Sequence, residues 1–173
     1  MYPKAYIQFL AHFHGDRDYF ECHEILEEYW KESNERKKNS IWVGFILLAV
    51  SRYHQRRKNF IGAKRTLEKA IKILSIQESR PNIQGLDSGS LFPLLSKLLD
   101  QINHEESYQS INLQIADPIL LDACIKECRS KGFIWGQESD LGDESIVHRH
   151  KLRDRTYVTE ERIEALKNRK DNR

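Results

Sequence analysis

Apolar positions near the start of the chain follow the spacing of amphipathic helices. From Ala5 to His14 they recur three and four residues apart, and Gly15 ends this pattern. From Arg17 to Lys31 the same spacing places six residues on one broad helix face, which is apolar except for a histidine and a glutamate. These residues are Tyr19, Cys22, His23, Leu26, Glu27 and Trp30. The pattern predicts two helices with a short connection, in which Asp16 caps the second helix.

The stretch IWVGFILLAV, from Ile41 to Val50, is apolar on every side. Such a pattern predicts a helix at the centre of the fold, and the stretch is too short to cross a bilayer. The helix is expected to continue further, so that one stripe runs along it: Val43, Leu47, Val50 and His54. Asn59 is the expected cap of the next helix, whose apolar positions extend from Phe60 to Leu74.

The second half of the chain has a weaker helical pattern. Proline, glycine and serine are frequent between Ser75 and Ser90, which predicts a long loop. Leu91–Ile102 is predicted to be helical, whereas Tyr108–Ile115 lacks helical periodicity and is expected to be extended. One more helix is predicted between Asp117, which precedes a proline, and Gly132.

These elements predict a mainly α fold, a helical bundle of about five to seven helices with little or no short β structure in the C-terminal half. A length of 173 residues suits one domain. We divide it into a helical core at residues 1–75, additional helices and an extended segment on the same domain at 76–146, and a basic C-terminal extension at 147–173. Apolar residues recur among the charges of the extension, so we expect it to dock on the bundle or on a second subunit.

Composition excludes several classes of protein. Hydrophobic residues make up 39% and charged residues 31%, as in a soluble domain with one core, and a formal net charge of +2 gives no general reason to expect nucleic acid. The absence of a long apolar run or a signal-peptide pattern predicts no membrane contact and a cytoplasmic location. The three cysteines, Cys22, Cys124 and Cys128, indicate neither a disulfide framework nor a zinc ribbon.

Three runs of the sequence resemble the domain of unknown function 309 family in its Gram-positive bacterial branch. They are GDRDYFECHEILEEYW from Gly15, GFILLAVSRYH from Gly44 and NFIGAKRTLEKAIKIL from Asn59, and HKLRDR from His150 also resembles that branch. The resemblance implies an all-helical core at about residues 1–75 and implies no reaction. Many relatives carry glutamine in the central helix where this chain has Leu47, so one polar group is missing here.

The candidate chemistry lies on the second helix. His23 and Glu27 are four residues apart on an otherwise apolar face, so each needs a polar partner. His54 is the expected partner from the central helix, with its atoms within roughly 3 to 5 Å of theirs. With Glu24 at the margin, these imidazoles and carboxylates suit a divalent metal, Zn, Mn, Fe or Ni. We therefore take His23, Glu24, Glu27 and His54 as candidate metal or ligand residues.

The same side chains allow other interpretations. A hydrogen-bond network among His23, Glu27 and His54 could simply fix the angle between two helices. A metal-dependent, hydrolase-like enzyme is another alternative, although Glu27 replaces the second histidine of the zincin motif H-E-x-x-H. The sequence identifies no catalytic residue. We favour a binding or scaffold module, in which a protein partner or self-association is possible.

Charge is unevenly distributed along the chain. Asp16–Trp30 contains six acids and one arginine, whereas Arg52–Lys72 contains eight basic residues and one glutamate, so neighbouring helices would compensate each other. We expect the basic helix end to be solvated. The alternative is an anion or nucleic-acid surface, whose candidates are Arg56, Arg57, Lys58, Arg149, Lys151 and Arg153. Acidic residues between the basic ones of the extension argue against a nucleic-acid partner.

Overall fold

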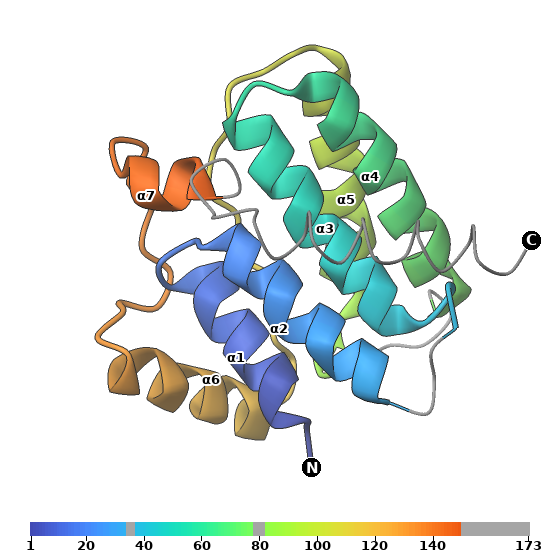
Figure 1. The fold of residues 1–173 in the computed structure, drawn as a ribbon. Coiled ribbons are helices and arrows are strands. Elements are labelled where there is room, and N and C mark those ends of the chain that lie inside the picture. The colour runs from blue at the N-terminus through green and yellow to red at the C-terminus, as the bar shows by residue number, and fades with distance from the viewer. Residues whose placement is uncertain (34–36, 78–81, 150–173) are drawn as a thin grey trace, which may run out of the picture.

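The computed structural model describes residues 1–33, 37–77 and 82–149, which form seven α-helices and two very short strands (Figure 1). The first four helices are α1 (Lys4–His14), α2 (Tyr19–Glu32), α3 (Ile41–Arg56) and α4 (Phe60–Leu74), followed by the 3₁₀ helix η1 (Ser75–Gln77). Strand β1 (Asn82–Ile83) pairs antiparallel with β2 (Leu86–Asp87), and the last helices are α5 (Ser88–Asn103), α6 (Pro118–Ser130) and α7 (Glu144–Val147). The predicted mainly α fold is confirmed.

Helix α3 lies at the centre of the bundle. It packs against α2 and α4, while α1 contacts α2 and α6, and α5 covers another side of α4 (Figure 1). The close approach of α3 to α4 requires Gly44, because a Cβ atom there would lie 2.8 Å from Cδ2 of Leu74. Helix α3 is buried along most of its length, as its uniformly apolar sequence predicts.

Local capping signals predict two of the helix starts correctly. The Asn59 side chain accepts a hydrogen bond from the Gly62 N–H at 3.0 Å, and the Asp117 side chain caps α6 in the same way. The prediction for Asp16 is wrong, because Asp18 caps α2. Arg17 has a φ of 60°, so the backbone turns there and the helix begins two residues further along.

The stretch between Ser75 and Ser90 contains more structure than the loop that its composition predicts. The strands β1 and β2 meet in a tight turn at Gly85, which has a φ of 84°. Helix α5 then begins at Ser88, with Asp87 as its cap. Residues 108–115 are not helical, as predicted, and Ile115 forms an isolated bridge with Leu86.

Arg17 is the main side-chain link between the helical core and the segments that follow α5 and α6. It is fully buried. Its guanidinium donates to the carbonyl oxygens of Phe13 at 2.8 Å, Ile111 at 2.5 Å and Gln137 at 2.8 Å, and to the Asn112 side chain at 2.8 Å. These acceptors are neutral, so the charge of Arg17 is stabilised by oriented dipoles of the backbone and one amide.

Two further arginines, on α3, are buried in the same way. Arg52 donates to the carbonyl of Gln109, and its Cζ atom lies 4.6 Å from the centre of the Tyr108 ring. Arg56 donates to the carbonyl of Arg17 at 2.7 Å and to Oγ of Ser139 at 3.0 Å. Together the three buried arginines, Arg17, Arg52 and Arg56, hold segments that have little regular structure of their own.

The expectation of a solvated basic end on α3 is therefore wrong for Arg52 and Arg56. Main-chain carbonyl groups accept hydrogen bonds from Nη atoms of both guanidinium groups, so these positive charges lie inside the fold and not in solvent. In the part of the chain that the structure describes, the acidic residues of α2 do not form ion pairs with Arg52 or Arg56. Glu27 of α2 pairs with Lys31 of the same helix, and Glu21 and the cap residue Asp18 pair with Arg149.

His14 makes a second buried link between α1 and the segment after α5. Its Nδ1 lies 2.8 Å from the Leu10 carbonyl and must donate, whereas Nε2 accepts the N–H of Leu113 at 2.9 Å. The ring stacks on Trp135 with 4.3 Å between centroids. Burial lowers the pKa of His14 to about 4, and the nearby charge of Arg17 acts in the same direction.

The helices show no segment that could span a membrane among residues 1–33, 37–77 and 82–149.

Candidate functional site

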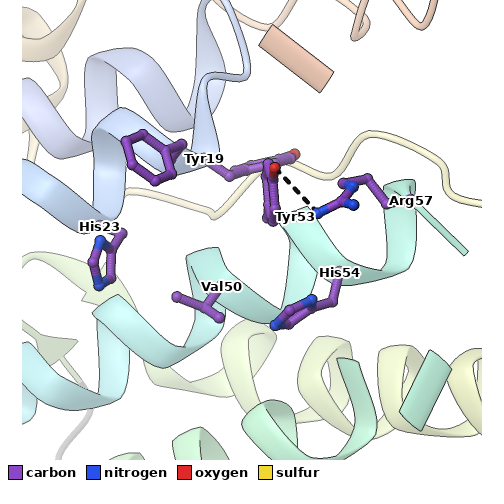
Figure 2. A pocket seen from close by; sticks show the side chains of 7 residues that line it. Tyr19, His23, Val50, Tyr53, His54 and Arg57 are labelled. Atoms are coloured by element: carbon purple, nitrogen blue, oxygen red, sulfur yellow. Dashed lines mark hydrogen bonds between the residues drawn. The ribbon is translucent and has the colours of Figure 1, made fainter. Parts of the chain in front are cut away.

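A partly open pocket of about 310 Å³ lies between α2 and α3 (Figure 2). Its lining combines three aromatic rings, two imidazoles, one aliphatic side chain and one guanidinium: Tyr19, Phe20, His23, Val50, Tyr53, His54 and Arg57. The walls are therefore mostly apolar, with polar groups at separate points. This composition is typical of a site for a small molecule.

Helical periodicity explains how the sequence forms the pocket. Phe20 and His23 are one turn apart on α2, and Val50, Tyr53 and Arg57 follow one another at three and four residues on and just after α3. The predicted stripe of α3 is half-buried along its whole length: Val43, Leu47, Val50 and His54. This side of the helix is partly open, and the pocket lies at its C-terminal half.

A compact group of metal-ligating side chains lies on α2, and its His23 lines the pocket. Atoms that could bind a metal in His23, Glu24 and Glu27 all lie within 4.8 Å of one another. His23 Nδ1 is 3.0 Å from Oε1 of Glu24, and Nε2 is 3.7 Å from Oε2 of Glu27. The imidazole therefore lies between two carboxylates, and Lys31 Nζ approaches Oε1 of Glu27 at 3.2 Å.

The polar residues of α2 are less buried than an apolar helix face predicts. The side chain of His23 is 28% exposed and that of Glu27 is 32% exposed. His23 lines the partly open pocket, whereas Glu27 is not among the lining residues. Solvent can therefore satisfy them, and the argument that each must have a buried partner does not apply.

His54 lies on the other wall of the pocket and outside the group on α2. In Figure 2 the side chain of Val50 lies between the rings of His54 and His23. The expected convergence of His54 with the α2 residues does not occur. Nδ1 of His54 is 3.1 Å from Nδ2 of Asn59, and the Oδ1 atom of that asparagine caps α4. Asn59 therefore donates to Nδ1 of His54.

Arg57 completes the pocket beside Tyr53. Its Cζ atom is 5.2 Å from the centre of the Tyr53 ring, and Nη1 donates to the tyrosine hydroxyl at 3.3 Å. The Nε–H of Arg57 is buried and has no hydrogen-bond partner. The guanidinium is thus fixed in place while its donors are incompletely used.

The other candidates for an anion or nucleic-acid surface do not form one patch with Arg57. Arg56 is buried against loop carbonyls, whereas Lys58 is exposed. Arg149 binds the carboxylate of Asp18 and lies 3.1 Å from Oε2 of Glu21. The last two candidates, Lys151 and Arg153, lie outside the described residues.

Sequence reasoning missed two aromatic walls of the pocket and one ion pair. Phe20 and Tyr53 both line it and contact each other, with 6.5 Å between ring centroids. The spacing of Phe20 to His23 on α2 and of Tyr53 to Arg57 on α3 was the available signal. No local signal points to the pairing of Asp18 with Arg149, since 131 positions separate these residues.

Comparison with known proteins identifies the family. Residues 6–66 match the family described as "Domain of unknown function (DUF309)". The chain is also 49% identical over 173 residues to "Uncharacterized protein YpuF" of Bacillus subtilis (strain 168), covering 100% of this chain and 99% of that protein. The chain belongs to the DUF309 family. The relative comes from a Gram-positive bacterium, as the resemblance predicted, and no solved structure matches.

The DUF309 match covers every residue that lines the pocket and the whole metal-ligating group on α2. It ends within α4, before the segments that the buried arginines hold. Neither description assigns an activity to the family or to the relative.

Proposed function

We propose that this protein is a binding module whose small-molecule ligand occupies the pocket between α2 and α3. The observation that carries this proposal is the lining of the pocket, where Phe20, Tyr53 and Val50 provide apolar walls and His23, His54 and Arg57 provide separated polar contacts. Apolar walls supply affinity through burial, and a few fixed polar groups select the ligand. A tightly packed helix pair with only a structural role would leave no such space.

We further propose that His23, Glu24 and Glu27 hold a divalent metal at the edge of this pocket. An imidazole nitrogen with carboxylate oxygens suits Zn, Mn, Fe or Ni. The three groups are already close to one another, and about a third of each side chain is exposed, so a metal could reach them without unfolding α2. A bound metal would offer an open coordination position to a ligand in the pocket.

Substitution Glu27→Gln should weaken Zn²⁺ or Mn²⁺ binding at least tenfold, because a neutral amide oxygen is a much poorer ligand than a carboxylate. Isothermal titration of the full chain, purified without nickel resin, measures this effect. Glu28→Gln is the matched control, since Glu28 is exposed on another face of the same helix. Glu27→Gln should change the free energy of unfolding without metal by less than about 1 kcal/mol, as expected for a solvent-accessible ion pair on one helix. Equal metal binding by both variants would contradict the proposed metal site.

We propose that the C-terminal extension, residues 147–173, docks on the bundle or on a second copy. Its described beginning supports this proposal. Val147 is only 6% exposed, and Arg149 binds Asp18 and Glu21 at the start of α2, with Cζ 6.0 Å from the Phe20 ring centre. The rest of the extension lies outside the described residues.

Deletion of residues 147–173 should lower the melting temperature by several degrees or change the oligomeric state. The deletion uncovers the apolar surface under Val147 and leaves the carboxylate of Asp18, which is 2% exposed, without its partner. Deletion of 150–173 alone keeps both contacts and separates their effect from that of the remaining residues. Unchanged stability and mass, together with loss of salt-sensitive RNA or DNA binding, would instead favour a nucleic-acid arm.

We also infer a cytoplasmic location. The three cysteines, Cys22, Cys124 and Cys128, are free and buried. Free thiols are typical of proteins in a reducing compartment.

A further inference from the structure

We infer that the ligand of the α2–α3 pocket is a small anion with a ring-shaped apolar body, whose carboxylate or phosphate binds Arg57. This inference rests on the proposed binding function and adds the chemical class of the ligand. It follows from the unused donors of Arg57, the local charge and the aromatic walls.

The hydrogen bonds of Arg57 leave its guanidinium incompletely satisfied. A guanidinium has five N–H donors, and the contact to Tyr53 at 3.3 Å is a long one. Its Nε–H is enclosed without a partner, and no carboxylate pairs with Arg57 in the described part of the chain. The Nε–H is itself buried, but Arg57 lines the pocket and its printed hydrogen bond uses a single Nη donor, so an anionic ligand there would accept hydrogen bonds from the other Nη donors.

The buried arginines show how this chain satisfies a guanidinium when it has a structural role. Arg17 has four acceptors within 2.8 Å, and Arg56 has a carbonyl and a hydroxyl within 3.0 Å. Arg52 and Arg56 each also have an Nε atom without a partner, but neither residue lines the pocket. Arg57 is the guanidinium that combines incomplete bonding with a place on the pocket wall.

The backbone around Arg57 has little net electrostatic effect on a ligand. Arg57 follows the C-terminus of α3, which carries a negative partial charge, and Asn59 precedes the N-terminus of α4, which carries a positive one. These opposite ends lie together at the same connection, so their effects largely offset each other. The side-chain charge of Arg57 therefore favours an anion at its end of the pocket, whereas Glu24 and Glu27 lie beside His23 on α2.

The remaining walls fit an apolar ring. Phe20 contacts both Tyr53 and His23, at 6.5 Å and 6.2 Å between ring centroids, so the three rings form one continuous surface against which a ligand ring can pack. A cavity of about 150 Å³ is enough to hold benzene. The pocket of about 310 Å³ therefore has room for one ring and an attached carboxylate or phosphate.

The test uses three probes that share a phenyl ring: benzoate, phenyl phosphate and the neutral benzamide. NMR titration of the full chain gives a dissociation constant for each. We expect at least one anion to bind tenfold or more tightly than benzamide, which corresponds to about 1.4 kcal/mol. The comparison of benzoate with phenyl phosphate shows which anionic group the site prefers.

Arg57→Gln should remove the preference for the anion, and Arg57→Lys should retain part of it through charge alone. Arg65→Gln is the matched control, because Arg65 is exposed on α4 and does not line the pocket. Equal affinities for all three probes in the unmodified protein would overturn the inference and leave the binding function intact. If no probe binds, both this inference and the small-molecule function fail, whereas the metal titration stands as a separate test.

Discussion

Replacing Arg17 by methionine should lower the free energy of unfolding by about 4 kcal/mol or more, because each buried acceptor left without a donor costs about 1 to 3 kcal/mol. The guanidinium donates to three carbonyls and one amide oxygen, and the residue is 0% exposed. Methionine fills much of the same volume, so the loss of hydrogen bonds dominates the effect. Urea denaturation followed by circular dichroism measures the change.

Two further variants test the reason for this loss. Arg17→Lys should also be strongly destabilising, because one ammonium group cannot reach acceptors that lie around a planar guanidinium. Arg65→Met is the control on α4, where the exposed side chain should contribute less than about 0.5 kcal/mol. A loss of less than about 1 kcal/mol for Arg17→Met would contradict the structural role assigned to these hydrogen bonds.

Acidification below pH 6.5 should destabilise the fold through His14. The ordinary pKa of 6.5 applies in the unfolded chain, whereas burial lowers the pKa to about 4 in the folded protein. Between these values the unfolded chain binds a proton that the folded protein does not, so the free energy of unfolding decreases as the pH falls. The contribution of His14 is complete above about pH 6.5 and is lost towards pH 4, with a total of about 3 kcal/mol.

The contacts of His14 explain why the folded protein resists this protonation. Nε2 accepts the Leu113 N–H, so a proton on that nitrogen would break the hydrogen bond and place two donors together. Urea denaturation of the unmodified protein and of His14→Gln at several pH values between 7 and 4 isolates the effect. The stability difference between the two should shrink as the pH falls. Parallel pH profiles would show that His14 does not cause the acid sensitivity.

Local sequence patterns predicted the helices well because they depend on neighbouring residues. The spacing of apolar residues predicted helices α1 to α4. Asn59 and Asp117 predicted two helix starts, because their side chains form short-range hydrogen bonds to the first turn. The prediction for Asp16 failed because the positive φ of Arg17 has no signal in the residue type. The burial of Arg52 and Arg56 was missed because basic residues at a helix end are usually exposed, and their acceptors come from distant segments.

The candidate site was predictable only within one helix. His23 and Glu27 share a face because they are four residues apart, and the structure places them 3.7 Å apart with Glu24 beside them. The position of His54 depends instead on how α2 crosses α3 and on where the side chain of Val50 lies. Side-chain packing between the two helices determines that crossing.

The buried arginines have a consequence for how the sequence of this protein can change over evolution. Most of their acceptors are main-chain carbonyls, including those of Gln109, Ile111 and Gln137. Every amino acid provides a carbonyl, so substitutions in these loops leave the acceptors intact as long as the path of the backbone is kept. The donors, in contrast, depend on arginine at fixed positions of the first half, within the range that defines the family. The loops can therefore diverge in sequence while the arginines keep them attached to the bundle.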